Sequence, residues 1–508
     1  MPDDQEDITP GEAVAGMSLN GLGFSDRPLS VPPQFFATKP VALLGRAGVS
    51  ADQCNRFKLG RSLGKVCSYG WDLWGSDSAP PVCRQAGIDL RFNRRDTTSF
   101  ARTGAYAPET ATQAMAILHG YAKAHRPDLP HAVLALMVSH DGGVPLLRQS
   151  WDGKASDTSV CKARGAACSA QCQARAAPRY LLAEAQVSTE VHAPHLTCVP
   201  FIPRRPETLK VTQQVLEQAW AGGEWQPLAA TTSSQRVALG HEGSAPRGLV
   251  VASQEAGQRA TTTVAKAQGT AYGQGQKQRL PLQAQRLASG EAARTALHPS
   301  PTTLPSHQGE HAAVTPHSPY ARPGRPTPEP PITAIRWHVR ASVVPDPAKS
   351  THRPQRQACV VLGPPIADTA LSDAEVLAGA KGQSAVEGGL RFLKAPVVFV
   401  SSLCVQKPSR RPGLLMVMTL AFLVYAVAQR RMRHPLARPQ ETLPNQIGQP
   451  TSRPTLRWIC QRLEGINRVT LSVHGHVDTL MEGLTDLRRK ILQLFGQKVC
   501  EIYRLSPG

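Results

Sequence analysis

The pattern of apolar and polar residues predicts a helical start to the chain. The segment from Thr9 to Glu12, TPGE, has the order of a helix capping box with proline at the first helical position. An apolar stripe of helical period follows it. Ser50 and Gln53 have the same spacing and predict a second helix start. We therefore predict a small helical domain over residues 1–86.

The pattern then changes to one that predicts strands. Ile88, Leu90 and Phe92 alternate as in a half-buried strand, and the polar segment RRDTTSF follows. Further apolar runs come next, two of them flanking an Asp-Gly-Gly turn typical of a β-hairpin: residues 132–138, 144–147, 180–183 and 201–202. Strands in succession, two of them followed by acids, predict a mixed sheet with polar chemistry at its strand ends.

The pattern weakens between residues 207 and 355. Nine prolines fall between Pro299 and Pro330, too many for a helix or a central strand, so this part is predicted to be an extended connector. A short strand is predicted over residues 359–362. Ser372 to Glu375 then reads as a capping box that opens one long helix.

That helix contains the stretch SAVEGGLRFLK, residues 384–394. Its polar residues recur at helical spacing and form one stripe: Gln383, Glu387, Arg391 and Lys394. A solvated face with a Glu–Arg pair four residues apart explains these charges. It does not explain Gly388 and Gly389, since each glycine costs about 1 kcal/mol in a helix. Glycines beside an acid are expected where something bulky approaches the backbone.

The net charge of the chain indicates which classes of partner it could bind. Its 508 residues carry 57 Lys and Arg against 37 Asp and Glu, a formal net charge of +20. Nucleic acid is the first candidate partner and a membrane surface the second, with solubility alone as the plain alternative. The apolar run over residues 414–428 has basic flanks and is shorter than a bilayer span, so a buried core helix is predicted instead.

The cysteines indicate a reducing compartment. The chain has 11, irregularly spaced, which argues against a disulfide framework. Cys161, Cys168 and Cys172 cluster, but without a CxxC pair or a following His pair, so small thiols at ordinary positions are favoured over a zinc site. The acidic start of the sequence does not resemble a signal peptide. A cytoplasmic protein is expected.

Three acids are candidates for metal chemistry. Asp96 and Glu184 each follow an apolar run, and each alone has the ordinary interpretation of a solvated loop acid. Together with the helical Glu387 they outline a two-metal phosphoryl-transfer site, in which one ion activates the attacking hydroxyl and the other stabilises the leaving oxygen.

Several longer stretches together resemble a known family: RRDTTSF, HRPDLPHAVLALMVSHDGGVPLL, SWDGKASDT, PRYLLAE, SAVEGGLRFLK and LLMVMTLAFLVYAVAQRR. They are similar to bacterial insertion-sequence transposases of the DDE type, in the insertion-sequence-four-like group. The resemblance covers nearly the whole chain and is thin only at about residues 163–177 and 207–320. It implies an RNase H-like α/β fold, with a mixed sheet flanked by helices. It also implies a long insertion before the helix that bears the catalytic Glu.

The resemblance further implies the site and the partners. Asp96, Glu184 and Glu387 would be the catalytic and metal-binding acids, with Mg²⁺ in a two-metal site and Mn²⁺ as a substitute. Lys394 matches the last residue of the signature Tyr-x2-Arg-x3-Glu-x6-Lys, and Gln383 occupies its Arg position; with Arg391 these are the DNA-binding candidates. The implied partners are terminal inverted repeats and target DNA, held by a homo-oligomer on paired ends, at the bacterial nucleoid and without a membrane.

The chain departs from the family at several positions. Glu184 replaces the second Asp, which moves its carboxylate by roughly 1 Å where catalytic sites tolerate about 0.5 Å. Ala380 replaces the signature Tyr, and Gly248 replaces the Trp of an Arg-Trp pair in the insertion, which removes a base-stacking platform. A DNA transposase with impaired activity is predicted from these changes. A non-catalytic DNA-binding relic is the alternative, and a membrane-associated protein built on residues 414–428 is a third.

The predicted organisation has five parts: a helical, DNA-binding N-terminal domain over 1–86, the first catalytic part over 87–206, the insertion and connector over 207–355, the second catalytic part over 356–435, and a C-terminal region over 436–508.

Overall fold

The structure is a computed structural model, and it describes most of the chain in separate ranges. The described residues are 8–24, 32–41, 45–46, 48–69, 71–101, 118–120, 128–154, 180–183, 201–205, 209–238, 247–284, 287–297, 307–317, 335–345, 355–363, 371–381, 383–394, 410–438, 441–474 and 476–505.

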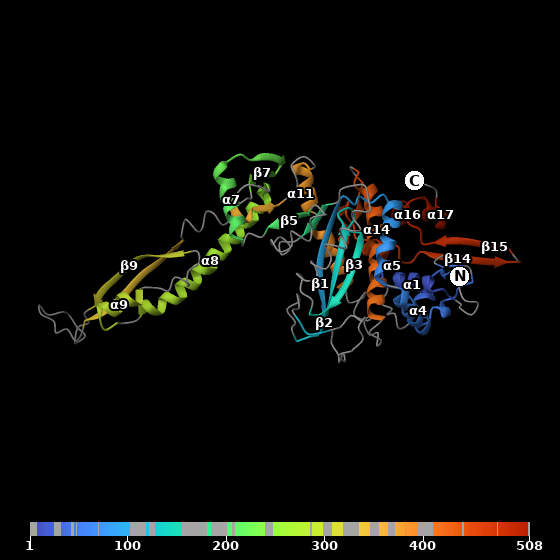
Figure 1. Cartoon of the computed structure of the whole chain (residues 1–508), viewed down its shortest axis with the longest axis horizontal. Helices are drawn as coiled ribbons and strands as arrows, with labels where there is room; N and C mark the ends of the chain where they lie inside the picture. The colour runs from blue at the N-terminus through green and yellow to red at the C-terminus, as the bar shows by residue number, and fades with distance from the viewer. Residues whose placement is uncertain are drawn as a thin grey trace. The chain divides into compact units, whose positions relative to one another are not determined.

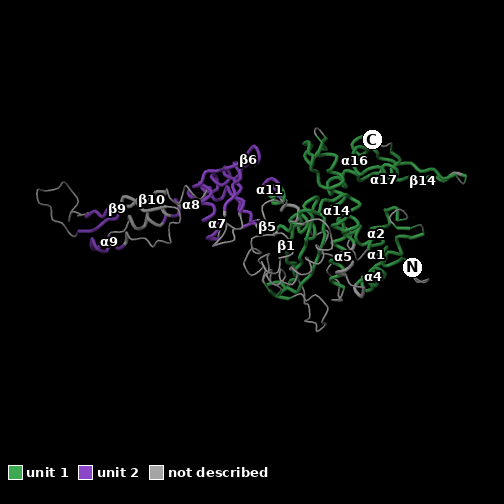
Figure 2. Tube along the Cα trace, turned by 45° about the horizontal axis from the view of Figure 1, so that its top comes forward, with its two compact units in different colours: residues 1–203, 375–508 green, residues 204–374 purple. Residues whose placement is uncertain are grey.

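The chain divides into two compact units. Unit 1 comprises residues 1–203 and 375–508, and unit 2 comprises residues 204–374 (Figure 2). Helices and several sheets occur together, so the mixed α/β class predicted from the sequence is confirmed.

Unit 1 is built on a mixed sheet whose strands lie in the order β3-β2-β1-β4-β5. Its members are β1 (Phe92–Ala101), β2 (His131–Ser139), β3 (Pro145–Asp152), β4 (Tyr180–Ala183) and β5 (Phe201–Arg205). The first three pair antiparallel, whereas β4 pairs parallel with β1 and β5 parallel with β4. This order and these directions are those of an RNase H-like sheet, as the sequence led us to expect.

The strands agree with the sequence in most places. The hairpin β2–β3 turns through Gly142 and Gly143, which adopt φ of 81° and 64°, values that favour glycine. However, β1 begins only at Phe92, so Ile88 and Leu90 precede the strand instead of forming it. The polar segment RRDTTSF is therefore the strand itself, and Asp96 pairs with Leu136 in its middle rather than standing at its end.

The N-terminal helices pack on a long apolar helix from the other end of the chain. They are α1 (Pro10–Asn20), α2 (Pro32–Phe36), the 3₁₀ helix η1 (Ala51–Gln53), α4 (Arg56–Tyr69) and α5 (Trp71–Gln85). The predicted capping box is present, since Glu12 N–H donates to Thr9 Oγ1 at 3.2 Å and Thr9 N–H donates to Glu12 Oε2 at 2.8 Å. At Ser50 the predicted helix is only the one-turn η1.

The apolar run predicted to be a core helix is α14 (Arg411–Leu436). Figure 1 shows it between the sheet and the N-terminal helices, and it contacts β3 as well as α1. Met416 and Met418 are fully buried. It is the single helix in the described part of the chain that is long and apolar enough to cross a membrane by length and composition. In its most apolar window of 18 residues, 61% of the residues are already buried inside the protein. The burial supports its reading as a core helix.

The segment predicted to be helical from residue 373 contains two described helices. They are α11 (Asp373–Lys381) and α12 (Gln383–Lys394), and residue 382 between them lies outside the described residues.

The C-terminal region of unit 1 contains short helices and two hairpins. Its elements are β12 (Leu443–Pro444), β13 (Pro450–Thr451), α15 (Leu456–Arg462), β14 (Asn467–Val473), β15 (His476–Glu482), α16 (Asp486–Gln493) and α17 (Gln497–Ile502). Its core joins Ile459 and Ile491 to Met432 and Leu436 at the end of α14.

Unit 2 contains more regular structure than the sequence predicted. Its elements are α7 (Lys210–Gly222), β6 (Gln226–Ala229), β7 (Thr232–Ala238), β8 (Arg247–Ser253), α8 (Gln254–Ala284), α9 (Gly290–Leu297), β9 (His307–His317), β10 (Arg336–Pro345) and β11 (Cys359–Leu362). Strands β11, β8, β7 and β6 pair antiparallel in that order, and Arg204 and Arg205 of β5 pair with β11. Val215, Leu216 and Val250 lie in the core between α7 and these strands.

The part predicted to be an extended connector, residues 299–330, is described only over residues 307–317. There the prediction is wrong, because β9 pairs antiparallel with β10 in a hairpin that includes Pro316 near one end. The other eight prolines of that part lie outside the described residues, as do the cysteines at 161, 168 and 172.

Candidate functional site

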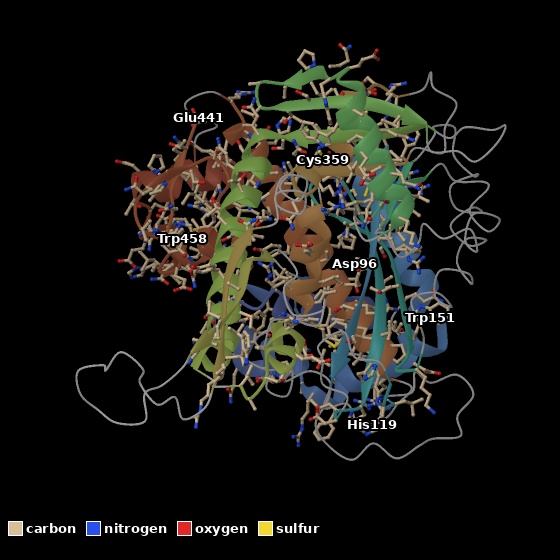
Figure 3. The ribbon with its side chains drawn as sticks, turned by 90° about the vertical axis from the view of Figure 1, so that its left-hand side faces the viewer. Asp96, His119, Trp151, Cys359, Glu441 and Trp458 are labelled. Carbon is tan, nitrogen blue, oxygen red and sulfur yellow. The ribbon has the colours of Figure 1, made fainter. Side chains whose placement is uncertain are left out.

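Asp96 is the candidate acid that the sheet positions most firmly. It lies in the middle of β1, the central strand of the five in unit 1, and Figure 3 labels it there. The side chain is half-buried, and its Oδ1 accepts a hydrogen bond from Thr97 N–H at 2.6 Å. An acid on a central strand has a fixed backbone, which is what a metal ligand or catalytic carboxylate requires.

Glu387 lies on α12, which packs on β1, β2 and α14. Leu390 and Leu393 are buried against the sheet side, whereas Glu387 is exposed. The helix therefore presents Glu387 at the border between its packed face and solvent.

The same face of β1 carries Asp96 and meets α11 and α12. Residues two apart on a strand share a face, so Arg94, Asp96 and Phe100 point to one side. Arg94 Nη2 donates to the carbonyl of Gly379 on α11, and Lys394 Nζ on α12 lies 5.9 Å from the centre of the Phe100 ring. Asp96, between them on the strand, thus faces the helix that carries Glu387.

Arg94 is the strongest electrostatic feature beside the two acids. It is 6% exposed, and its Nε has no hydrogen-bond partner among the described residues. Burial lowers the pKa of Arg94 to about 10, and the charge of Glu387 opposes that shift. Even so the guanidinium stays charged at neutral pH, so it attracts Glu387 toward β1.

Arg94 was missed by the sequence analysis, although it stands two residues before Asp96. The alternation of β1 was the available signal, because it assigns residues 94 and 96 to one face once the strand is placed correctly. Arg91 strengthens the same junction, since its Nη1 lies 2.6 Å from Glu375 Oε1 on α11.

The two glycines after Glu387 have different environments. A Cβ built on Gly389 would overlap the ring of Phe422 on α14, closer than real Cβ atoms approach. A Cβ on Gly388 would meet nothing within 4 Å. The expectation that both glycines serve an approaching ligand is therefore wrong for Gly389, which lets α12 pack on α14. For Gly388 the expectation stays a prediction.

The remaining candidates divide into described and undescribed residues. Arg391 and Lys394 are exposed on α12, as expected for the polar stripe. For Gln383 the structure describes the backbone, in the first turn of α12, and not the side chain. Glu184 lies outside the described residues. It follows Ala183, the last residue of β4, which is the strand that pairs parallel with β1.

The described residues fit a metal site in chemistry but do not complete one. Asp96 and Glu387 offer carboxylate oxygens, which are the donors that Mg²⁺ prefers. Within the described ranges no group of three His, Cys, Asp or Glu side chains could hold a metal ion. Any such site in this part of the chain would need a further ligand, and Glu184 is the candidate next to β4.

Comparisons with known proteins give limited matches. Residues 1–73 match a family described as a domain of unknown function, DUF4277. No curated protein matches the chain. A cryo-EM structure of a piggyBac transposase synaptic complex with hairpin DNA matches 87% of this chain and 76% of that chain, at 9% sequence identity and a TM-score of 0.32. At that TM-score the likeness carries no argument, so the family match is confined to the N-terminal helices.

Proposed function

We propose that the chain is a transposase-like, DNA-processing protein of the DDE type, in the insertion-sequence-four-like group, with impaired catalytic activity. One observation carries the proposal: Asp96 on the central strand of an RNase H-like sheet faces the helix that bears Glu387. The net charge of +20 supports DNA as the partner, because phosphate contacts require basic surface.

Each candidate residue has a defined task in this proposal. Asp96, Glu184 and Glu387 would hold Mg²⁺ or Mn²⁺, which when bound supplies Lewis-acid activation of the attacking hydroxyl and stabilises the leaving oxygen. Arg94 holds α11 against β1 through the carbonyl of Gly379, and its positive charge attracts Glu387 toward the strand. As a positioning residue it would act through Glu387 rather than on the substrate.

The basic stripe of α12 would bind the DNA backbone. Arg391 lies four residues after Glu387, and Lys394 lies seven residues after it, so the three side chains share one side of the helix. Gln383 begins the same stripe one turn before Glu387. Gly388, with open space beside it, would let a phosphate approach the helix backbone next to the acid.

Impaired activity follows from the departures of the sequence. Glu184 is one methylene longer than the expected Asp, and Ala380 lacks the expected Tyr hydroxyl. A misplacement of roughly 1 Å exceeds the tolerance of about 0.5 Å for catalytic groups. The bacterial origin, the nucleoid-associated cytoplasmic location, the terminal inverted repeats and the homo-oligomer on paired ends belong to the same proposal.

The test is Mg²⁺- or Mn²⁺-dependent nicking of DNA that carries the ends of the element encoding this chain. We expect weak nicking that the double variant Glu184→Asp with Ala380→Tyr increases and that Asp96→Asn abolishes. Vigorous nicking by the unaltered chain would contradict the impairment. Nicking that Asp96→Asn leaves unchanged would contradict the site itself.

A non-catalytic DNA-binding relic is the second candidate, favoured by the same departures at Glu184 and Ala380. It predicts DNA binding that weakens as salt rises, with no nicking by either the unaltered chain or the double variant. On this alternative Glu387→Gln changes DNA affinity only through the loss of one negative charge. Recovery of nicking in the double variant would exclude it.

A further inference from the structure

A cavity of about 590 Å³ lies between the N-terminal helices and the C-terminal region, and both of its walls belong to unit 1 (Figure 2). One wall is formed by the segments that follow α1 and α2, with Phe24 and Lys39. The other is formed by α15 and the turn that joins it to β14. Sites for small molecules have volumes of about 300–1,000 Å³. Asp96 and Glu387 do not line this cavity, so it is separate from the candidate site.

One face of α15 and of the turn after it is directed to the cavity. Arg457, Cys460, Gln461 and Glu464 line it, and they recur at intervals of three and four residues, the spacing of one helical face. The other face of the helix is buried in the core through Ile459. The position of α15 is thus fixed by its packing, while its polar side chains remain available to the cavity.

Arg488 holds the turn after α15 in place. Its Nε donates to the carbonyl of Arg462 at 2.9 Å, its Nη1 to the carbonyl of Gly483 at 2.5 Å, and its Nη2 to the carbonyl of Glu464. Gly465 lies within this turn and adopts φ of 83°, a value that favours glycine. A wall tied in this way is preformed, so a ligand does not have to order it on binding.

Two cations line the cavity without an acid to neutralise them. Among the described residues no ion pair joins the guanidinium of Arg457 or the ammonium of Lys39 to a carboxylate. Arg457 donates through its backbone N–H to Tyr425 Oη at 3.4 Å, and Lys39 Nζ lies 5.9 Å from the centre of the Phe35 ring, so both charges remain uncompensated. Glu464 lines the same cavity, but its backbone lies about 10 Å along the helix from that of Arg457. The cavity therefore offers positive charge to an anionic group and, at a distance, a carboxylate to hydrogen-bond donors.

The rest of the described lining is mainly apolar or carries amides. Phe24, Leu463 and Ile466 supply apolar surface, and an aromatic ring can stack on a nucleobase. Gln461 and Asn467 each supply an amide, which donates and accepts hydrogen bonds as the edge of a base does. Together with the cations and the carboxylate, this lining contains a partner for each part of a nucleotide.

We propose that this cavity binds a free nucleoside monophosphate. The phosphate contacts Lys39 and Arg457, the base lies against Phe24 with Gln461 at its edge, and the ribose hydroxyls donate to Glu464. Other small ligands fit worse. Two cations repel a divalent metal ion, a dicarboxylate has no donor for Glu464, and a sugar phosphate has no planar ring for the apolar surface. The inference rests on the cavity alone and does not depend on the proposed function.

The test is isothermal titration calorimetry of the full chain without DNA. The ligands are the monophosphates of adenosine, guanosine, cytidine and uridine, each up to about 1 mM, a concentration at which weak binding is detectable. We expect saturable binding of at least one nucleotide. Inorganic phosphate and the corresponding nucleoside should each bind at least about tenfold more weakly, because each lacks part of the contacts.

Variants assign the binding to the cavity. Arg457→Ala and Lys39→Ala should each weaken nucleotide binding by about tenfold or more, since each removes a charged hydrogen bond to phosphate, and both side chains are exposed, so the fold should be retained. Arg462→Ala is the matched control. Arg462 is on the same helix, but its guanidinium lies over the Trp458 ring at 4.4 Å and does not line the cavity, so affinity should be unchanged. Gln461→Trp fills the cavity from an exposed position and should abolish binding.

Four results would overturn the proposal. The first is the absence of saturable binding of all four nucleotides, and the second is binding that Gln461→Trp leaves intact or that Arg457→Ala and Arg462→Ala weaken equally. The third is inorganic phosphate that binds as tightly as the best nucleotide, which indicates an anion site only. The fourth is a single-stranded oligonucleotide with a terminal phosphate that displaces the nucleotide at lower concentration, which assigns the cavity to a DNA end. None of these results depends on nicking at Asp96, so this proposal and the proposed function fail separately.

Discussion

The two adjacent glycines of α12 give the sharpest test of how this helix is held. Gly389→Ala places a methyl group against the tip of the Phe422 ring, at its Cζ, whereas Gly388→Ala places one in open space. Each substitution gains about 1 kcal/mol of helix propensity. Overpacking costs about 1–3 kcal/mol, so Gly389→Ala should be neutral to destabilising by about 2 kcal/mol, while Gly388→Ala should stabilise by about 1 kcal/mol.

Thermal unfolding, followed by circular dichroism, measures the difference between these variants. A gap of about 1–3 kcal/mol corresponds to a few degrees at roughly 2 °C per kcal/mol for a large unit. We expect the unfolding midpoint of Gly388→Ala to lie above that of the wild type and that of Gly389→Ala to lie at or below it. Equal midpoints for the two variants would refute the packing of α12 on Phe422.

Three further predictions address electrostatics and reactivity. Burial by itself would raise the pKa of Asp141. The hydrogen bonds from Arg430 and from Asp89 N–H together outweigh this effect, so the pKa in the folded protein lies below the usual value near 3.8. The Asp141–Arg430 pair should therefore contribute about 2 kcal/mol to the free energy of unfolding above about pH 4, and this contribution should be lost as the pH falls through the lowered pKa. When the free energy of unfolding is measured against pH in acid, Asp141→Asn should show a smaller slope than the wild type. Arg391→Ala and Lys394→Ala should each reduce by about one the slope of log affinity for DNA against log salt concentration, measured by fluorescence anisotropy. Arg489→Ala on α16 is the control and should leave this slope unchanged. Equal effects of all three substitutions would refute a specific role for α12. Burial raises the pKa of Cys460 to about 11, so iodoacetamide at pH 8 should label it about a hundredfold more slowly than an unfolded thiol, and labelling at the unfolded rate, detected by mass spectrometry, would contradict its burial.

The sheet of unit 1 could be predicted where apolar runs are continuous. Residues 132–138 and 180–183 are buried strands with little polar interruption, and β2 and β4 are found there. The placement of β1 failed for the opposite reason. Its residues are mostly polar, and they are buried by pairing on both sides and by α11 and α12, which no local pattern reveals.

Unit 2 was harder to predict because its helices and strands show only a weak periodicity of apolar residues. Helix α8 is rich in Gln, Thr and Gly, with few apolar residues, and only Ala260 and Val264 are buried among its described side chains. Such a composition reads as a linker in sequence. Its helical form depends mainly on contacts with β10, which lies more than 50 residues further along the chain.

At the candidate site, too, features that depend on local spacing could be predicted, and features that depend on tertiary packing could not. The polar stripe of α12 followed directly from helical spacing, and the exposure of Glu387, Arg391 and Lys394 agrees with it. The tight packing of Gly389 and the buried Arg94 could not be predicted, since both depend on which helix meets which strand.

The central claim is that Asp96 and Glu387 belong to one metal-binding site, and Mn²⁺ binding to the full chain without DNA tests it most directly. Electron paramagnetic resonance counts free Mn²⁺, so it reads out binding without requiring activity. We predict saturable binding that Asp96→Asn and Glu387→Gln each weaken by at least about tenfold, while Asp52→Asn on the surface of the N-terminal helices leaves it unchanged. Binding that survives both substitutions, or that is lost equally in the control, would contradict the site.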